Sequence, residues 1–146
     1  MAEGIDIQYL LKLNNKIFRS SQVYLDKALK KYGLTSGSYP YLLMLRDCEG
    51  INQNMISEKL GYDKAMSTRT ITKLIKLGYL SRKKDESDSR AYKLYLTEEA
   101  KVIAEELIEK IHELIGLITK NLSEAEKAIT MDSLNKILYN IRNLEM

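Results

Sequence analysis

LGYDKAMSTRTITKLIKLGYLSRKKDESDSRAYKLYLTEEAK spans residues 60–101 and contains two different hydrophobic periods. In its first half, four side chains recur at the 3.6-residue spacing of one helix face, namely Ser67, Thr70, Ile71 and Leu74. Asp63 is placed to cap this helix and Gly78 to end it. In the second half, residues 79–84 and 91–96 alternate apolar with polar side chains, which is typical of strands. The stretch therefore predicts a helix followed directly by a β-hairpin, with DESDSR as the hairpin loop.

A shorter helix is expected just before Gly61. Asn52 can cap it, and we expect Met55, Ile56 and Leu60 to face inward. Two short helices joined by a glycine-containing turn form a helix-turn-helix, whose second helix enters the DNA major groove, and an attached hairpin makes it a winged helix. The opposite face of the second helix carries small, hydroxylated or cationic side chains that can approach bases and phosphates: Lys64, Ala65, Thr68, Arg69, Thr72 and Lys73.

Three acids occur in the expected hairpin loop, inside the most basic part of the chain. A wing tip has to hold a cation over the minor groove, where the potential is negative. Asp88 lies two residues before Arg90 and can hydrogen-bond its guanidinium or the loop amides, which would fix its direction. Arg82, Lys83 and Lys84 on the approach strand would lie near phosphates. An alternative interpretation is that the acids belong to an ordinary solvated turn.

Charge is distributed unevenly along the chain, although the net charge is only +3. Residues 1–58 carry seven Lys/Arg and six Asp/Glu, residues 59–93 carry ten and four, and residues 94–146 carry six and ten. The middle segment is therefore net +6 beside a last segment of net −4. Such an excess is typical of a protein that binds a polyanion, and a solvated basic face would give the same composition.

Long helices are expected on both sides of the region 34–97. Over residues 5–33, apolar side chains recur seven residues apart, at Leu11, Phe18, Leu25 and Tyr32. Within residues 98–146, Ser123 and Glu126 form a capping box for a last helix. The apolar positions of that helix are Leu134, Ile137, Leu138, Ile141 and Leu144. Because one small monomer cannot cover all this surface, we expect a homodimer with 5–33 and 98–146 as dimerisation helices and two reading regions that address a pseudo-palindromic site.

Length and composition predict one domain over residues 1–146, mainly α-helical with a small β-hairpin wing. No run of about 18 apolar residues could span a membrane, and the start MAEGIDIQ lacks the pattern of a signal peptide. A single cysteine, Cys48, agrees with a reducing compartment. We therefore expect a cytoplasmic protein without a membrane partner.

Motifs for catalysis are missing from the sequence. The one histidine, His112, lies between Lys110 and Glu113 in a helical pattern, which indicates a solvated position. The sequence contains no glycine-rich phosphate loop and no Cys-x-x-Cys or His-x-x-x-His metal pattern. We therefore expect no enzymatic activity, no metal and no cofactor.

The stretch 60–101 resembles the core of the MarR family of bacterial and archaeal transcriptional regulators, and the helix order on both sides is similar too. The most specific part of the resemblance is the wing. There the family shows an acid, a further Asp, an Arg two places on, and then Leu-Thr; here these are Asp85, Asp88, Arg90, Leu96 and Thr97. The resemblance implies that Arg90 enters the minor groove and that Asp88 supports it. It further implies a homodimer that represses, or less often activates, nearby genes.

Two positions depart from the family pattern. Ser89 stands where an arginine is common, which would weaken the contact of the wing with the DNA backbone. Ala100 stands where a glycine is common, and this should change little because alanine is the better helix former.

The resemblance also implies that a small ligand or oxidation loosens the grip on DNA. Family effector pockets lie between the dimer helices and the reading domain, and often take aromatic carboxylates or phenols. The residues placed for such a pocket are Tyr24, Tyr32, Tyr39 and Tyr41, although core aromatics with hydroxyls at the surface fit the same pattern. Redox control is disfavoured, since the first helix has no cysteine. The alternative function is a winged-helix module that contacts protein or RNA without sequence-specific DNA binding.

Overall fold

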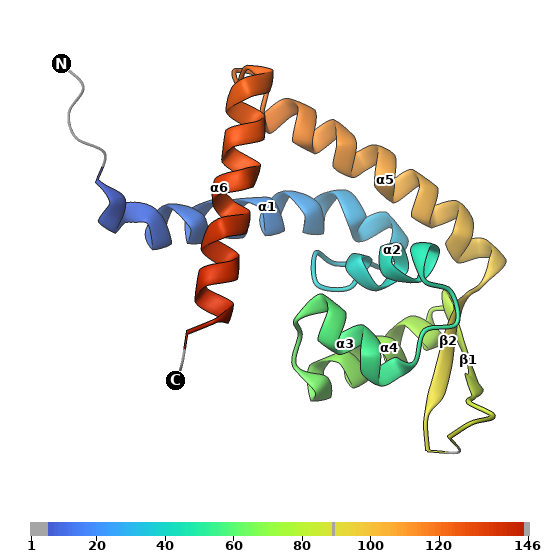
Figure 1. The fold of residues 1–146 in the computed structure, drawn as a ribbon. Helices are drawn as coiled ribbons and strands as arrows, with labels where there is room; N and C mark the ends of the chain where they lie inside the picture. Colours follow the sequence, from blue (N-terminus) through green and yellow to red (C-terminus); the bar gives the residue numbers. More distant parts are fainter. Residues whose placement is uncertain (1–5, 89, 145–146) are drawn as a thin grey trace. The chain divides into compact units, whose positions relative to one another are not determined.

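The computed structural model describes residues 6–88 and 90–144, so Ser89 of the wing lies outside the described residues. The described chain is mainly helical with a two-stranded antiparallel hairpin, which confirms the expected fold class (Figure 1). The elements, in order, are η1 (Ile7–Tyr9), α1 (Leu10–Leu29), η2 (Lys30–Tyr32), α2 (Tyr39–Asp47), α3 (Gln53–Leu60), α4 (Lys64–Lys76), β1 (Leu80–Lys84), β2 (Tyr92–Leu96), α5 (Glu98–Ile118) and α6 (Glu124–Arg142).

The chain divides into two compact units at a point inside α5. The first unit is Met1–Ile108 and the second is Glu109–Met146. The region expected to read DNA, residues 34–97, lies entirely in the first unit. None of the helices in the described part of the chain is long and apolar enough to cross a membrane.

Local capping fixes the ends of both short helices of the helix-turn-helix. The side chain of Asn52 accepts a hydrogen bond from the amide of Asn54 at 2.8 Å, and that of Asp63 accepts from the amide of Met66 at 3.0 Å. Between the helices Gly61 has φ 71°, a left-handed conformation that a residue with a side chain rarely adopts. Both caps and the turn are as predicted from the sequence.

The inward face of α4 packs on the core of the first unit. Ile71 and Leu74 are 0% and 1% exposed, and the hydroxyl of the buried Ser67 lies 2.6 Å from that of Tyr41 on α2. Thr70, expected on this face, is only half-buried. Other fully enclosed core residues are Leu29, Leu42, Leu45, Ile56, Leu94, Ala104 and Leu107. This core holds α4 with one face inward and the other turned to solvent.

One inward assignment on α3 is wrong. Met55 is 48% exposed, whereas Ile56 is fully buried. The neighbouring Ser57 takes the second inward position, and its hydroxyl donates to the carbonyl of Asn54 at 3.0 Å. A serine can lie inside because this local bond satisfies its hydroxyl, and the 100° step between residues then turns Met55 outward.

The hairpin is tied to the start of α3 along its second strand. β1 and β2 pair from Leu80 opposite Leu96 to Lys84 opposite Tyr92. An isolated bridge joins Asn52 to Lys93, next to the bond from the amide of Leu94 to the carbonyl of Ile51 at 3.0 Å. The wing and the helix-turn-helix therefore share main-chain hydrogen bonds, which limits their relative movement.

Two of the long helices, α5 and α6, begin at a capping side chain, and the capping box of α6 is as predicted. The hydroxyl oxygen of Thr97 accepts a hydrogen bond from the main-chain amide of Ala100 at 3.2 Å. Ala100 is fully buried, so the methyl group of alanine fits at a position where the family often has glycine. In the second unit, Ser123 and Glu126 exchange the two bonds of a capping box at 3.1 and 3.0 Å. In that unit α6 has no buried residue among those described.

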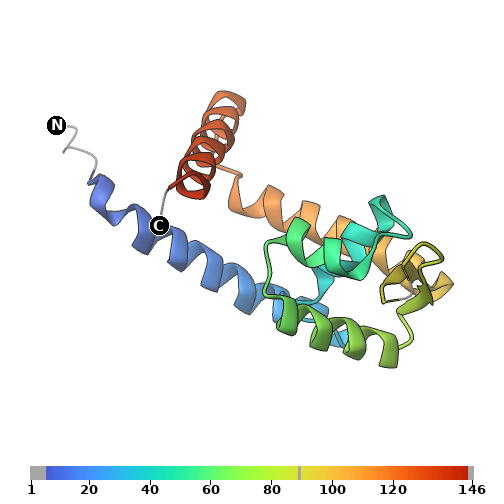
Figure 2. The ribbon, with the colours of Figure 1, turned by 60° about the horizontal axis from the view of Figure 1, so that its bottom comes forward.

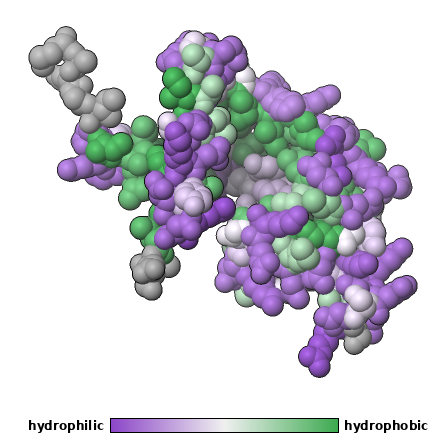
Figure 3. Space-filling view, viewed as in Figure 1, coloured by the Kyte–Doolittle hydropathy of each residue, from purple (hydrophilic) through white to green (hydrophobic). Residues whose placement is uncertain are grey.

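Apolar side chains remain exposed on several helices. On α1 they are Leu11, Leu13, Ile17, Phe18, Val23 and Tyr24. On α6 they are Ile129, Met131, Leu134, Ile137, Leu138, Tyr139 and Ile141. The hydropathy view shows such apolar colour over the N-terminal part of α1, and hydrophilic side chains over the wing at the lower right (Figure 3).

Candidate nucleic-acid interface

The outward face of α4 carries every residue predicted to enter the major groove. Lys64, Ala65, Thr68, Arg69, Thr72 and Lys73 are all exposed. The helix and the wing belong to the lower side of the view in Figure 1, which comes forward in Figure 2. The structure thus places the six side chains together on one solvent-facing side of the helix, as an element that inserts into a groove requires. Their contact with DNA stays a prediction.

The threonine hydroxyls of this face are bonded to their own helix. Thr68 donates to the carbonyl of Lys64 at 3.0 Å, and Thr72 donates to the carbonyl of Thr68 at 2.9 Å. Such bonds to the carbonyl four residues earlier are a common alternative to solvent for threonine in helices. The bonds determine which groups the two side chains can offer a partner.

The acids of the wing organise its tip. Asp85 accepts two hydrogen bonds from Ser87, from the amide at 3.0 Å and from the hydroxyl at 2.7 Å. These bonds hold the pKa of the Asp85 carboxyl below its usual range, because they stabilise its charged form. Asp88 accepts from the main-chain amide of Arg90 at 3.0 Å, and its own carbonyl accepts from the amide of Ala91 at 3.0 Å. Of the two sequence alternatives for Asp88, the structure has the bond to a loop amide, so Asp88 restrains the backbone that carries Arg90.

The cations of the approach strand lie on two faces of the hairpin. Side chains alternate along a strand, so Arg82 and Lys84 point to one face and Lys83 to the other. The guanidinium of Arg82 lies 5.0 Å from the ring centre of Tyr92, and the ammonium of Lys83 lies 5.3 Å from that of Tyr95. Both tyrosines come from β2 and restrain the cations through cation–π contact. The sequence reasoning missed these tyrosines, although the alternation of β2 could have revealed them.

Of the four tyrosines predicted for a ligand pocket, Tyr39 lines a cavity. Tyr41 is fully buried, with its hydroxyl against Ser67. Tyr24 is 42% exposed on α1. The hydroxyl of Tyr32 donates to the carboxylate of Glu106 at 2.6 Å, and this bond, which stabilises the phenol, raises the pKa of Tyr32 to about 12. Tyr24, Tyr32 and Tyr41 are therefore not among the residues that line the cavity of Tyr39, although the ring centre of Tyr41 lies 5.9 Å from that of Tyr62, which does line it.

The cavity that contains Tyr39 lies inside the first unit, between α1, the loop before α2, and α4. Its volume is about 340 Å³. It is lined by Phe18, Ser21, Gln22, Leu25, Ser36, Gly37, Tyr39, Pro40, Tyr62 and Met66. Burial raises the pKa of Tyr39 and of Tyr62, so both present neutral phenols. Tyr62 and Met66 flank the N-terminus of α4 and were not expected here, because no local pattern predicts which residues a cavity gathers.

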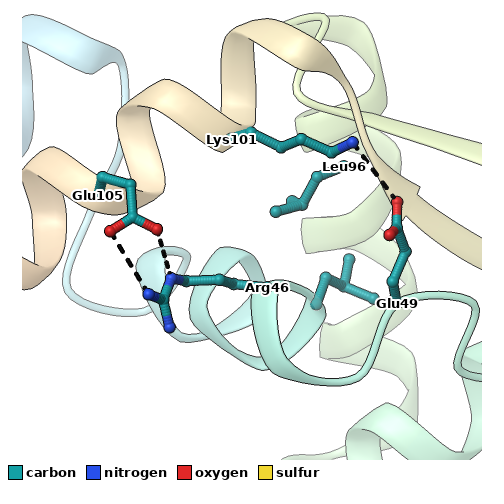
Figure 4. Close-up of a pocket in the computed structure, with 6 residues that line it drawn as sticks. Arg46, Glu49, Leu96, Lys101 and Glu105 are labelled. Atoms are coloured by element: carbon teal, nitrogen blue, oxygen red, sulfur yellow. Dashed lines mark hydrogen bonds and ion pairs between the residues drawn. The ribbon is translucent and has the colours of Figure 1, made fainter.

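A second hollow of about 220 Å³ lies between α2 and the N-terminal half of α5 (Figure 4). Its charges are paired with each other: Arg46 Nε lies 2.6 Å from Glu105, and Lys101 Nζ lies 3.9 Å from Glu49. Exposed pairs of this kind contribute little to stability, because water and salt screen them. These ion pairs link α2 and the residues after it to α5. Because the charges already have partners, the hollow is poorly suited to a charged ligand.

Removal of the Asp88 carboxylate is expected to weaken DNA binding, although it removes a negative charge. Asp88→Ala deletes the acceptor for the Arg90 amide, so Arg90 loses its direction, at a cost of about 1 kcal/mol. Fluorescence anisotropy with an operator duplex measures the effect. Glu86→Ala is the matched control, because it removes the same charge from the same loop and no hydrogen bond of its side chain is found in the described chain. Tighter binding by both variants would show that the acids only repel DNA.

A helix-turn-helix with an exposed, cation-bearing second helix and an attached hairpin defines the winged-helix class of DNA-binding proteins. The model of the MarR family matches residues 34–92. The HTH-type transcriptional regulator BilQ of Clostridioides difficile (strain CD3) is 31% identical over 108 residues, which cover 74% of this chain and 73% of BilQ. The chain belongs to the MarR family of DNA-binding transcriptional regulators. This is a family of regulators and not of enzymes.

Solved structures show the same fold over nearly the whole chain. A MarR protein from Peptoclostridium difficile superposes with a TM-score of 0.90 at 29% identity, and the match covers 98% of this chain and 94% of that one. A MarR family regulator from Listeria monocytogenes, solved in complex with a 26mer DNA, gives a TM-score of 0.84 with 90% and 87% coverage. Its identity is 24%, so this likeness concerns the fold.

Proposed function

We propose that the chain acts as a homodimeric repressor that binds a pseudo-palindromic operator. The observation that carries the proposal is the pairing of an exposed, cation-bearing α4 face with a wing whose Arg90 is restrained by Asp88. Residues 34–97 form the reading region in this proposal, and a bound dimer blocks transcription by covering the promoter. Membership of a family of transcriptional regulators supports the same conclusion.

The dimerisation helices in this proposal are residues 5–33 and 98–146. Support comes from the apolar side chains that α1 and α6 leave exposed. Such surface is typical of an interface between subunits, because it costs free energy in water. A two-fold dimer would present two copies of α4 to half-sites about 34–36 Å apart, one turn of DNA.

Each predicted contact has a chemical partner in DNA. Arg69 can donate two hydrogen bonds to one guanine in the major groove, and Arg90 can enter the negative minor groove. Lys64 is the first residue of α4 and Lys73 lies in its last turn, and both suit phosphates. The full proposed contact set is Lys64, Ala65, Thr68, Arg69, Thr72, Lys73, Arg82, Lys83, Lys84, Asp88 and Arg90.

Selection from random DNA duplexes, followed by fluorescence anisotropy, tests this function without knowledge of the operator. The expected result is an inverted-repeat sequence, bound by two protomers per duplex, far more tightly than a scrambled duplex and more weakly as salt rises. Failure to enrich any sequence, with equal weak binding to all duplexes, would overturn the proposal. It would favour a winged helix that contacts protein or RNA.

We also propose that a small aromatic ligand in the 340 Å³ cavity releases the operator. The volume is within the range of small-molecule sites, and Tyr62 and Met66 connect the cavity with the N-terminus of α4. The polar groups of the lining are neutral hydroxyls and an amide, from Ser21, Gln22 and Ser36 beside the tyrosines. No Lys or Arg of the described chain lines the cavity, which favours a phenol over a carboxylate.

Calorimetry on the free protein is expected to show binding of simple phenols and weaker binding of the corresponding benzoates. Met66→Trp should abolish it, because the larger side chain fills the cavity. Met55→Trp is the matched control, since Met55 is exposed on α3 outside the lining. Benzoate binding tighter than phenol binding, or phenol binding that survives Met66→Trp, would contradict the assignment.

A further inference from the structure

The hydrogen bonds of α4 limit what its threonines can offer to a base. A hydroxyl group has one hydrogen, and in Thr68 and Thr72 that hydrogen is directed to a main-chain carbonyl of the same helix. Each oxygen can then only accept, and the remaining group of the side chain is its methyl. As presented to a partner, each threonine is therefore a methyl group beside a hydrogen-bond acceptor.

These two threonines lie in line with Ala65 on the exposed face. Residues 65, 68 and 72 are three and four positions apart, so they follow each other along one side of the helix. All three are exposed, and none has a polar hydrogen left for a partner. The cations that can donate, Arg69 and Lys73, lie beside this line.

In the major groove, the A·T pair is the base pair that offers partners both for methyl groups and for hydrogen-bond acceptors. Thymine carries a C5-methyl group, the single apolar group of the groove, and its partner adenine presents an amino group that donates. Guanine presents two acceptors at the same edge, and acceptor-only threonines leave these without donors. Cytosine offers an amino donor and no methyl group. An A·T pair therefore satisfies both the methyl groups and the acceptors of α4.

We propose that Ala65, Thr68 and Thr72 select A·T pairs, principally through contact of their methyl groups with thymine methyls. Arg69 and the cations beside the line then supply the donors for guanine and phosphate. This specificity rests on the proposed function as a reader of duplex DNA. It assigns the recognition of bases to the methyl groups of the threonines and not to their hydroxyls.

Uracil substitution tests the inference, because uracil is thymine without the methyl group. The best duplex from the selection is prepared with thymine, with uracil in the half-sites, and with uracil only in the flanks. For the wild-type protein we expect each thymine methyl removed under α4 to lower affinity about fourfold, the value of one buried methylene-sized group. Uracil in the flanks should have no effect.

Variants of the threonines separate the methyl groups from the hydroxyls. Thr68→Val/Thr72→Val keeps the methyl groups, and should retain the preference for thymine over uracil. Thr68→Ser/Thr72→Ser keeps the hydroxyls and the methyl group of Ala65, and should reduce the preference for thymine strongly. Arg69→Ala should weaken binding to both duplexes and leave their affinity ratio unchanged. Because the readout is a ratio, a general loss of affinity does not disturb it.

Two results would overturn the inference while leaving DNA binding intact. One is equal affinity of the wild-type protein for thymine and uracil duplexes, and the other is a serine variant that distinguishes them as strongly as the wild type does. Failure to bind any selected duplex is a different result, because it would overturn the proposed function itself.

Discussion

The double variant Arg69→Ala/Arg90→Ala is expected to lose about 2–6 kcal/mol of operator binding free energy per half-site. Each arginine is worth about 1–3 kcal/mol as a well-placed charged contact to DNA. The two lie on different elements, α4 and the wing loop, so their losses should nearly add. This variant removes the arginine contacts to the major and the minor groove together, and it should leave weak binding with most of the preference for the selected duplex lost.

Anisotropy with the selected and the scrambled duplex measures this loss. Lys12→Ala/Lys120→Ala is a matched control, because both lysines are exposed outside α4 and the wing. Both lie in the proposed dimerisation segments, so gel filtration first has to show that this variant is as dimeric as the wild type. This control also removes two positive charges, but far from the proposed DNA-binding surface. At physiological salt it should change the affinity for DNA little, since distant charges are screened. If the arginine variant bound as the control does, neither α4 nor the wing would be the reading surface.

Alanine at two adjacent residues of α4 should affect different properties, the stability of the fold in one case and DNA binding in the other. Ile71 is fully buried, so Ile71→Ala should lower the free energy of unfolding by about 2–5 kcal/mol through lost contacts and a cavity. Thr72 is exposed on the other face, so Thr72→Ala should change stability by no more than about 0.5 kcal/mol and still weaken operator binding.

Urea unfolding at one fixed protein concentration, together with anisotropy, checks this pair. The concentration has to be fixed because the stability of a dimer depends on it. Equal destabilisation by the two variants would mean that the inward and outward faces of α4 are assigned wrongly.

Much of the reading region could be predicted because its signals are local. Asn52 and Asp63 cap helices through bonds to residues two or three positions away, and periodicity separates Ile71 from Thr72. The error at Met55 has a local cause too, since a serine took the inward position that hydrophobicity assigned to methionine. Hydrophobic patterns cannot anticipate a polar residue that satisfies its own hydroxyl.

The lining of the cavity could not be predicted from the sequence, because it depends on contacts between distant segments. Tyr62 and Met66 join Tyr39 in one cavity only because α1, α2 and α4 pack around it. Tyr41, equally aromatic and two residues from Tyr39, is turned into the core against Ser67. Which tyrosine lines a cavity depends on the packing between helices. This packing depends on many residues that are far apart in the sequence, so no short motif predicts it.

Hydroxyl-radical footprinting of wild-type protein and Arg90→Ala on the selected operator tests the central claim most directly, because the radical attacks the backbone through the minor groove. We expect two protected regions related by two-fold symmetry, with half-sites about one turn of DNA apart. In Arg90→Ala one minor-groove segment of each half-site should lose its protection while the rest remains. A single unsymmetrical region, or an identical footprint for both proteins, would contradict a dimer that reads DNA with α4 and the wing.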